Sequence, residues 1–498
     1  MTAPGSTDPD GTWIGIDLGT QSVRVLAVRG DGVVVGRGSS ALSSRRDGPR
    51  HEQDPEQWWS AVGEASRHAT ADLDPATVRG VATDGTSGTV LLTDVDGTPL
   101  TPGLMYDDAR AHDHLAAVDV AGADVWAALG YQRMQVSWGL PKLLWLLQER
   151  AEAGGSRDVR LSHQVDLVNR RLVGHAVATD LSNALKTGAH LVDHGWPTTV
   201  MDRLGVPAEV LPPLVAPGAG LGRVGAAGAA ATGIPAGTPV VAGTTDGCAS
   251  QLGAGVVDVG SWNSVLGTTL VLKGVTERPV VDPAGVVYSH RGPAGRWLPG
   301  GASSSGAGVV PSMFPGADLD ALTRGAREHE PSGALTYPLV SEGERFPFVA
   351  PGARAFTVGS SGDDADRFAS VLQGVAHVER LCYDYLDLLG APLHGDVVLT
   401  GGASGNAYWC QLRADVLGRE VRVPDDATPA LGMAVLAAAG EGDPAPVAAA
   451  MTGTSRTYEP RQTRDRLLEG YVALVDQLER RGWLAEPVAA HARRGAHA

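Results

Sequence analysis

The sequence predicts an α/β protein built from two similarly folded halves. The chain has 498 residues, and single hydrophobic cores stop growing near about 250–300 residues, so at least two domains are expected. A strand–turn–strand pattern over Trp13–Val28 returns weakly over Asp258–Gly274, as two related domains would leave it. Strand, glycine turn and helix follow one another again over Asp396–Gly418. We expect domains at 11–248 and 249–445, with a C-terminal helix and tail over 446–498 packed on them.

The first of these patterns is a β-hairpin with polar chemistry at its tip. Alternating apolar residues precede and follow a break at Gly19 and Thr20, which predicts two short strands. The tip also carries Asp17, Ser22 and Arg24, and a glycine there lets backbone N–H groups approach an anion. The alternative is an ordinary hairpin whose hydroxyls satisfy their own turn.

The rest of the first half alternates strands and helices. Val33–Val35 predicts a third strand, and a helix follows with Asp54 as N-cap and Pro55 at its first position. A buried strand then ends at the turn Asp84–Gly88, and such strand ends are where open α/β sheets bind ligands. Further segments are predicted as amphipathic helices over 140–147 and 165–172, a polar loop over 179–188, a linker-like but doubtful stretch over 215–237, and a buried strand over 240–242.

The second half repeats this organisation around two more glycine turns. Gly267–Thr268 lies between two strands, and Gly401–Gly402 ends a strand before a helix that Asn406 can cap. The stretch from Gly308 to Thr357 is predicted to be irregular, followed by helices over 368–389, 431–440 and 467–478, and the tail after Pro487 is predicted to fray. The helix over 431–440 is rich in small residues, which suits close packing.

Composition excludes several classes of protein. Forty Lys and Arg against 56 Asp and Glu give a net charge of −16, which disfavours binding to nucleic acid or anionic lipid. Neither an export signal nor an apolar run long enough to span a bilayer is found, so a cytoplasmic protein is expected. The cysteines and three histidines lack the spacing of a disulfide framework or metal site: Cys248, Cys382, Cys410, His51, His163 and His290.

The three glycine turns at strand ends predict a nucleotide held by backbone amides rather than by a basic patch. No GxxxxGK[ST] occurs, and no GxGxxG follows a strand, so P-loop and Rossmann folds are disfavoured.

With these motifs in order, the sequence resembles the FGGY carbohydrate kinases of the actin-like, ribonuclease-H-like ATPase superfamily. DLGTQSVR resembles the first phosphate motif of the family. GTTDGC with SVLGTT is similar to its catalytic Asp and second phosphate hairpin, and LTGGASGNAYW to its adenosine motif. The resemblance covers roughly residues 12 to 440. It implies two ribonuclease-H-like domains that face each other across a cleft, with ATP and Mg²⁺ as cofactors.

Within the family, the sequence is most similar to D-ribulose kinases of the cyanobacterial and plant-plastid type. TDGTSGTVLL, NALKTG, AGTTD, GVVYSH, PGGAS and GERFP each have near counterparts there, whereas xylulokinases more often carry a Met-His-Gly turn at 84–88. MYDDAR departs from this type because it keeps Arg110 beside Asp108.

The resemblance also implies site roles, because phosphoryl transfer needs positioning and charge neutralisation more than covalent catalysis. Asp17 would hold the metal, and Asp246 would be the base that accepts the proton of the sugar hydroxyl. The nucleotide would bind at Asp17, Gly19, Thr20, Gln21, Arg24, Gly267, Thr268, Gly401, Gly402 and Asn406. The sugar would bind at Thr86, Ser87, Gly88, Asp108, Lys186 and Asp246.

Each role has a simpler alternative. Asp246 could cap the helix that follows it, Thr86 and Ser87 could satisfy their own turn, and Lys186 could be a solvated loop residue. For the whole protein the expected reaction is phosphorylation of a ketopentose, D-ribulose before D-xylulose or another polyol. The expected partners are sugar and ATP, with a homodimer allowed. The rivals are an actin-like ATPase without a sugar acceptor and an inactive sugar-binding regulator.

Overall fold

The computed structural model describes residues 8–156, 158–462 and 465–496, which divide into two compact α/β units. Unit 1 comprises residues up to Val257 together with Ser289–Leu298 and Asp426–Gly453. Unit 2 comprises Asp258–Tyr288, Pro299–Asp425 and the chain from Thr454. The prediction of two α/β domains is confirmed, and neither unit is continuous in the sequence.

Unit 1 is built on a mixed sheet of six strands in the order β12-β13-β6-β1-β2-β3. The predicted hairpin is present as β1 and β2, which pair antiparallel, while β6 and β13 continue the sheet parallel to β1. In order across the sheet the strands are Gly220–Arg223, Pro239–Val241, Val78–Gly85, Thr12–Leu18, Ser22–Arg29 and Val34–Ala41. Because β1 and β6 are parallel, their carboxyl ends meet at one edge of the sheet.

Helices cover both faces of this sheet. On one face α1 (Pro55–Thr70), capped by Asp54 as predicted, packs with α4 (Gln164–Val173) and α7 (Ala226–Thr232). On the other face lie α8 (Asp246–Gly253) and α13 (Pro429–Ala439).

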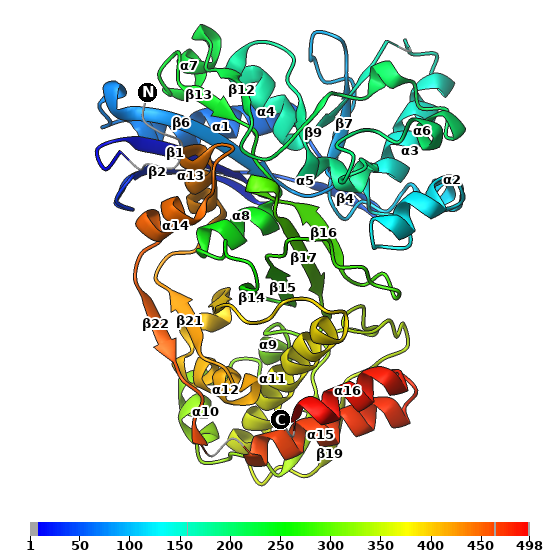
Figure 1. Cartoon of the computed structure of the whole chain (residues 1–498), viewed down its shortest axis with the longest axis vertical. Coiled ribbons are helices and arrows are strands. Elements are labelled where there is room, and N and C mark those ends of the chain that lie inside the picture. Colours follow the sequence, from blue (N-terminus) through cyan, green and yellow to red (C-terminus); the bar gives the residue numbers. More distant parts are fainter. Residues whose placement is uncertain (1–7, 157, 463–464, 497–498) are drawn as a thin grey trace. The chain divides into compact units, whose positions relative to one another are not determined.

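Helix α13 reaches unit 1 from far along the chain, and Figure 1 shows it in orange-brown beside the blue strands β1 and β2. A Cβ at Gly15 of β1 would lie 1.8 Å from the carbonyl oxygen of Ala430, and a Cβ at Gly432 would lie 1.9 Å from that of Ala249 in α8. The small residues of this helix therefore allow the close packing that the sequence predicts. The short helix α14 (Ala445–Met451) follows it within unit 1.

A smaller sheet of five strands, in the order β4-β5-β8-β7-β9, completes unit 1. Its strands are Arg45–Asp47, Arg50–Gln53, Gly103–Leu104, Val90–Thr93 and Arg160–His163. The helices α2 (Leu115–Ala128), α3 (Gly139–Glu152), α5 (Leu181–Ala184) and α6 (Thr198–Arg203) belong to the same unit, with the short strand pair β10 (Thr179–Asp180) and β11 (Leu214–Val215). The linker-like stretch over 215–237 is thus folded, as β12 and α7.

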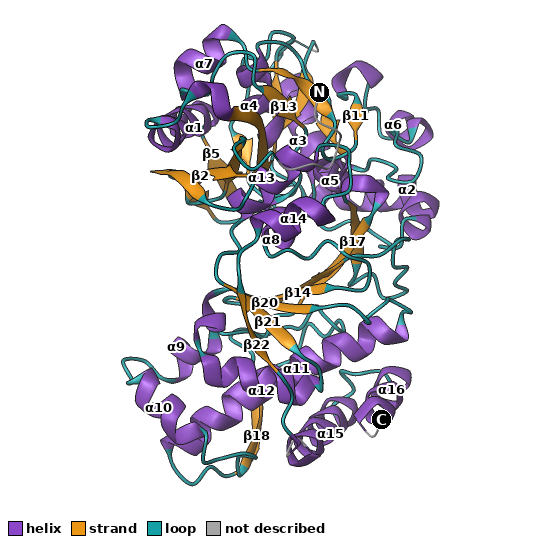
Figure 2. Ribbon diagram, turned by 60° about the vertical axis from the view of Figure 1, so that its left-hand side comes forward, coloured by secondary structure: helices purple, strands orange, loops and turns teal. Residues whose placement is uncertain are grey.

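The second large sheet has the order β16-β17-β15-β14-β20-β21-β22. Its strands are Tyr288–Arg291, Trp297–Ala302, Leu270–Gly274, Trp262–Leu266, Val397–Thr400, Val421–Pro424 and Ser455–Tyr458. The predicted hairpin over Asp258–Gly274 is present as β14 and β15, and β20 runs parallel to β14. Figure 2 shows α12 (Ala407–Leu417) beside α11 (Asp364–Leu388), the long helix of the unit 2 core.

Two predictions for unit 2 are wrong. The stretch from Gly308 to Thr357 is not all irregular, because it contains α9 (Val309–Met313), α10 (Leu319–Ala326) and β18 (Ala334–Tyr337), the last paired with β19 (Phe356–Gly359). The tail after Pro487 forms α16 (Glu486–Ala496), whose fully buried Ala489 and Ala492 pack in the core beside α15 (Asp465–Arg480). Alanines at that spacing present a narrow apolar face that composition alone does not reveal.

Candidate active site

Three carboxylates lie together at the carboxyl end of the β1–β6 pair. Asp17 of β1 and Asp84 of β6 are register partners, and the next residue of β6, Gly85, bridges Thr245 just before Asp246. Asp17 is 5% exposed and Asp84 is 0% exposed. Neither carboxylate oxygen of Asp84 accepts a hydrogen bond from a donor in the described residues. Two buried carboxyl groups in contact are costly to ionise together, which marks this edge as a candidate ligand site.

The electrostatics of the pair agree with this geometry. Burial, followed by the charge of Asp246, raises the pKa of Asp17, and Arg24 opposes that shift. Burial also raises the pKa of Asp84, with further contributions from Asp17 and Asp246. Concentrated negative charge of this kind attracts a cation.

The carboxylates of this cluster could hold Mg²⁺ only together with other ligands. In the described part of the chain, no three Asp, Glu, His or Cys side chains are grouped closely enough to hold a metal ion by themselves. Mg²⁺ prefers oxygen ligands and usually keeps several waters beside one or two carboxylates and substrate phosphates. Asp17, with Asp84 behind it, fits that pattern.

Asp246 is the first residue of α8, and the N-cap position is occupied by its neighbour Thr245. Its Oδ1 accepts a hydrogen bond of 2.7 Å from the N–H of Gly247. That bond fixes the carboxylate at the positive end of the helix, next to Asp17 and Asp84.

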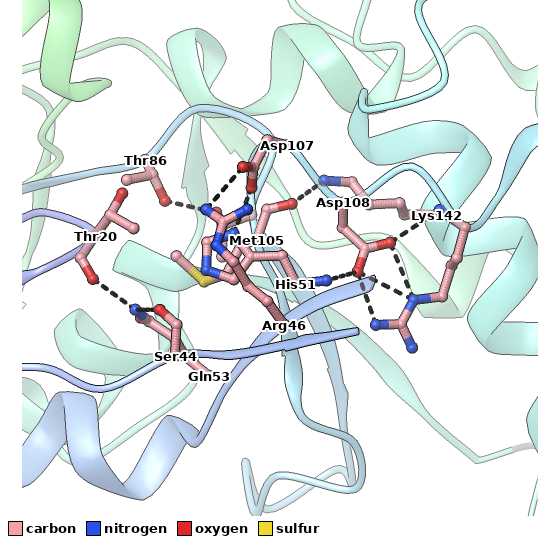
Figure 3. Close-up of polar contacts among 12 residues, drawn as sticks. Thr20, Ser44, Arg46, His51, Gln53, Thr86, Met105, Asp107, Asp108 and Lys142 are labelled. Atoms are coloured by element: carbon pink, nitrogen blue, oxygen red, sulfur yellow. Dashed lines mark hydrogen bonds and ion pairs between the residues drawn. The ribbon is translucent and has the colours of Figure 1, made fainter. Parts of the chain in front are cut away.

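Hydrogen bonds fix the tip of the first hairpin. The N–H of Gly19 donates to the carbonyl of Ser22 at 3.2 Å, which closes the turn. The side chain of Gln53 donates to the carbonyl of Thr20 at 2.6 Å, as Figure 3 shows. Gln21 and Arg24 are exposed, and Arg24 is the cross-strand partner of Asp17.

The predicted sugar turn and Lys186 are in contact, although Ser87 and Lys186 are 99 positions apart in the sequence. Lys186 Nζ donates to the carbonyl of Ser87 at 3.3 Å, and its Cδ would lie 3.1 Å from a Cβ at Gly88. The Ser87 hydroxyl is buried without a hydrogen-bond partner among the described residues. Thr86 differs, because its hydroxyl already contacts Thr89 at 2.5 Å.

Gln164, which no sequence motif indicates, fixes this turn. Its Oε1 accepts hydrogen bonds from both the N–H and the hydroxyl of Thr86, each at 2.9 Å. Its Nε2 is buried and without a partner in the described chain. Gln164 and Asp84 are candidate site residues that sequence reasoning missed. Asp84 could have been found as the acidic residue that directly precedes the turn at a buried strand end.

Asp108 is engaged within the protein. Its carboxylate accepts from Arg110 Nη2 at 2.7 Å and from the N–H of His51 at 2.7 Å. Arg110 in turn pairs with Glu52 at 2.7 Å and lies over the ring of Trp145. Arg110, which departs from the ribulose kinase pattern, therefore forms a buried ion pair with Asp108. Both Asp108 oxygens are occupied, because Arg110 Nε also donates to Oδ1 at 3.0 Å.

Next to this pair, Lys142 donates to the carbonyl of Met105 at 2.7 Å (Figure 3). Burial lowers the pKa of Lys142 to about 7, against an opposing effect of Asp108.

The two predicted nucleotide motifs of unit 2 also meet at one sheet edge. The N–H of Gly267 donates to the carbonyl of Thr269 at 3.2 Å and closes the hairpin tip. Gly401 has a φ of +87°, and a Cβ there would lie 2.6 Å from the carbonyl oxygen of Leu266, so only glycine fits. A Cβ at Gly402 would meet no atom within 4 Å.

Asn406 caps α12 as predicted. Its Oδ1 accepts from the N–H of Trp409 at 3.1 Å, and its Nδ2 donates to the hydroxyl of Thr323 at 3.1 Å.

Comparison with known proteins agrees with these two sets of strand-end motifs. The sequence matches the FGGY family of carbohydrate kinases, as its N-terminal domain over residues 12–253 and its C-terminal domain over residues 262–441. The chain belongs to this family. As an FGGY kinase it is a sugar phosphotransferase that uses ATP as the phosphate donor.

Similar proteins include several xylulose kinases. The one from Streptomyces rubiginosus is 32% identical over 452 residues, which cover 87% of this chain and 89% of that protein. The one from Bacillus subtilis is 26% identical, covering 86% and 88%. The crystal structure of xylulose kinase from Rhodospirillum rubrum has a TM-score of 0.83 and 25% identity, covering 94% of this FGGY kinase and 99% of that chain. Across the residues that the structure describes, no helix has the length and apolar character needed to cross a membrane.

Proposed function

We propose that this FGGY kinase transfers the γ-phosphate of Mg²⁺–ATP to the terminal hydroxyl of a ketopentose, with D-ribulose as the preferred substrate. The observation that carries the proposal is the cluster of Asp17, Asp84 and Asp246 at one strand-end edge of unit 1. In this cluster the carboxylate oxygens of Asp17 and Asp84 suit a metal ion, and the carboxylate of Asp246 can accept a proton.

In this proposal Asp17 holds the magnesium ion, which would neutralise charge on the transferring phosphate. Thr20, Gln21 and Arg24 with the Gly19 amide bind phosphate oxygens from the first hairpin, and Gly267 and Thr268 do so from the second. Gly401 and Gly402 bind the adenosine, and Asn406 contributes indirectly, because its side chain already caps α12 and donates to Thr323. Backbone amides at tight glycine turns suit this task because they approach an anion closely.

Asp246 acts as the general base. Its carboxylate accepts the proton of the sugar hydroxyl as that oxygen attacks the γ-phosphorus, the bond from the γ-phosphorus to the bridging oxygen breaks, and ADP leaves. The hydrogen bond from Gly247 keeps the carboxylate oriented.

The sugar contacts proposed are Ser87, Gly88 and Lys186. The buried, unpartnered hydroxyl of Ser87 supports a role as a ligand for a sugar hydroxyl, and Lys186 lies directly beside it. Thr86 and Asp108 contribute indirectly, because their polar atoms already hold the turn and the Arg110 ion pair.

The choice of D-ribulose rests on the Asp84–Gly88 turn, which resembles that of ribulose kinases. D-xylulose is the second candidate because the relatives described above are xylulose kinases. Initial rates with D-ribulose, D-xylulose, L-ribulose, ribitol and glycerol would decide between them. ATP consumption that none of these acceptors stimulates would overturn the assignment of a ketopentose substrate.

The base is tested by Asp246→Ala. We expect turnover to fall by about 10²–10⁴-fold, the usual contribution of a positioned base, while calorimetry shows ATP and ketopentose binding within a few-fold of the wild type. Asp124→Ala, on the exposed face of α2, is the matched control and should keep full activity. Near-normal turnover of Asp246→Ala would exclude the mechanism.

A further inference from the structure

Backbone hydrogen bonds join the second phosphate hairpin to a loop that lies further along the chain in unit 2. This hairpin-support loop, Ser303–Gly308, forms four backbone hydrogen bonds with Gly267–Leu270. Ser303 N donates to Leu270 O at 2.9 Å, Leu270 N to Ser305 O at 2.7 Å, Ala307 N to Gly267 O at 2.9 Å, and Gly308 N to Thr268 O at 3.1 Å. Any movement of the loop is therefore passed to the hairpin tip.

The contact between loop and hairpin leaves little room for adjustment. A Cβ at Gly306 would lie 2.4 Å from the carbonyl oxygen of Thr268, and a Cβ at Gly308 would lie 2.7 Å from the methyl group of Thr268. Backbone and side chain of Thr268 thus rest directly on the loop, so the position of the loop sets the position of Thr268.

A single buried carboxylate, Glu344, organises the start of this loop. It is 3% exposed. Its Oε1 accepts from the N–H of Ser304 at 2.7 Å and from that of Arg345 at 3.0 Å. Its Oε2 accepts from the hydroxyl of Ser303 at 3.0 Å and that of Tyr337 at 2.8 Å.

These donors are uncharged, and hydrogen bonds to an ionised acceptor are roughly twice as strong as neutral ones. The Ser303 hydroxyl continues the network by accepting from the N–H of Ser305 at 3.0 Å. Glu344 is therefore the acceptor on which the loop from Ser303 to Ser305 folds, although it lies 76 positions beyond Thr268. Desolvating a carboxylate here would be costly without these donors.

We propose that Glu344 is a positioning residue for ATP: through the hairpin-support loop it holds Gly267 and Thr268 in the geometry that binds the phosphates. The inference rests on the proposed function, which assigns this hairpin to phosphate. Displacements of about 1 Å by residues remote from the chemistry can cost about 100-fold, so a loosened loop should weaken ATP use without touching the sugar.

The structure separates two substitutions of this residue. In Glu344→Gln one oxygen can still accept from the two backbone amides, while the new NH₂ group faces two hydroxyls that can rotate and accept from it. Glu344→Leu has no acceptor for any of these donors. We expect the KM for ATP to rise about 10- to 100-fold in Glu344→Leu and only about threefold or less in Glu344→Gln, with the KM for the ketopentose unchanged in both.

Glu342→Gln is the matched control, since Glu342 is exposed and pairs only with Arg354 on the surface in the described contacts. It should leave both KM values unchanged. If Glu344→Leu does not fold, Ser303→Ala removes one donor and the link to Ser305 and should raise the KM for ATP several-fold.

Thr268→Val distinguishes the two levels of the argument. A raised KM for ATP in Thr268→Val, with no change in Glu344→Leu or Ser303→Ala, would refute the positioning role and keep the phosphate assignment. No change in Thr268→Val would refute a phosphate contact by the Thr268 hydroxyl. Equal increases in both KM values for Glu344→Leu would indicate a general structural role and overturn the inference.

Discussion

Replacement of Gln164 by Met tests how the sugar turn is held. The carboxamide oxygen of Gln164 is the acceptor for two donors of Thr86, the N–H and the hydroxyl, each at 2.9 Å. Met has a similar volume and flexibility but no comparable acceptor, so the change removes the hydrogen bonds with little change in packing. The turn Thr86–Gly88 should then lose its fixed geometry.

The size of the effect follows from what each donor can find instead. The Thr86 hydroxyl keeps its contact with Thr89, whereas the Thr86 N–H is left buried without an acceptor. An unsatisfied buried donor costs about 1–3 kcal/mol, and the turn can avoid this cost by relaxing in the free enzyme. If the sugar must restore the turn, its KM should rise by roughly 5- to 150-fold.

Steady-state kinetics with D-ribulose and D-xylulose, each at saturating ATP, would measure this effect, and the KM for ATP should stay within about twofold of the wild type. Gln148→Met on α3 is a suitable control because Gln148 contacts only the exposed Glu152 in the described structure. An unchanged sugar KM in Gln164→Met, with a folded protein, would show that the turn does not depend on Gln164.

Two further predictions concern stability. Burial lowers the pKa of His377 from 6.5 to about 4. Between these pH values the folded protein binds fewer protons than the unfolded chain, so the free energy of unfolding decreases as the pH falls. The total decrease is about 3 kcal/mol. In His377→Gln, whose Nε2 can still donate to the Leu467 carbonyl, the loss of stability between pH 7 and pH 4.5 in urea should be smaller; equal losses would contradict this account. Gly15→Ala should destabilise unit 1 by about 1–3 kcal/mol or more, because its Cβ would lie 1.8 Å from the Ala430 carbonyl oxygen, whereas Gly220→Ala on the edge strand β12 meets no atom within 4 Å and should be tolerated. Thermal melts of both variants would measure this, and equal melting temperatures would rule out the packing argument.

The parts of the fold that the sequence predicts are those encoded locally. Both hairpins, at β1–β2 and β14–β15, follow from alternating apolar residues around a Gly-Thr break. The cap of α12 follows from Asn406 alone. By contrast, the tail after Pro487 is predicted to fray because it is a chain terminus, whereas it forms α16, whose two buried alanines contribute little to any hydrophobic pattern.

The parts that the sequence does not predict depend on contacts between distant segments. Asp84 acquires its meaning from the parallel pairing of β6 with β1, which brings it beside Asp17. Gln164 opens a helix and matches no motif, yet it holds a turn 78 positions earlier. Asp108 stood out as an acidic residue for sugar binding, but the side chain of Arg110, only two positions away, occupies it. The sequence shows that Asp108 and Arg110 are close along the chain, but it does not show that their side chains point toward each other.

Under the proposed function, the sugar turn and the second phosphate hairpin belong to different units, so kinetics can separate their contributions. The contacts that hold the sugar turn, from Gln164 and Lys186, lie within unit 1, and the contacts that hold the second phosphate hairpin, from Glu344 and its loop, lie within unit 2. Discrimination between ketopentose epimers requires only about 1–3 kcal/mol, which is the scale of one or two such hydrogen bonds. Substitutions of residues that hold the sugar turn should therefore change the preference between D-ribulose and D-xylulose. Substitutions of residues that hold the phosphate hairpin should lower the use of ATP equally with either sugar.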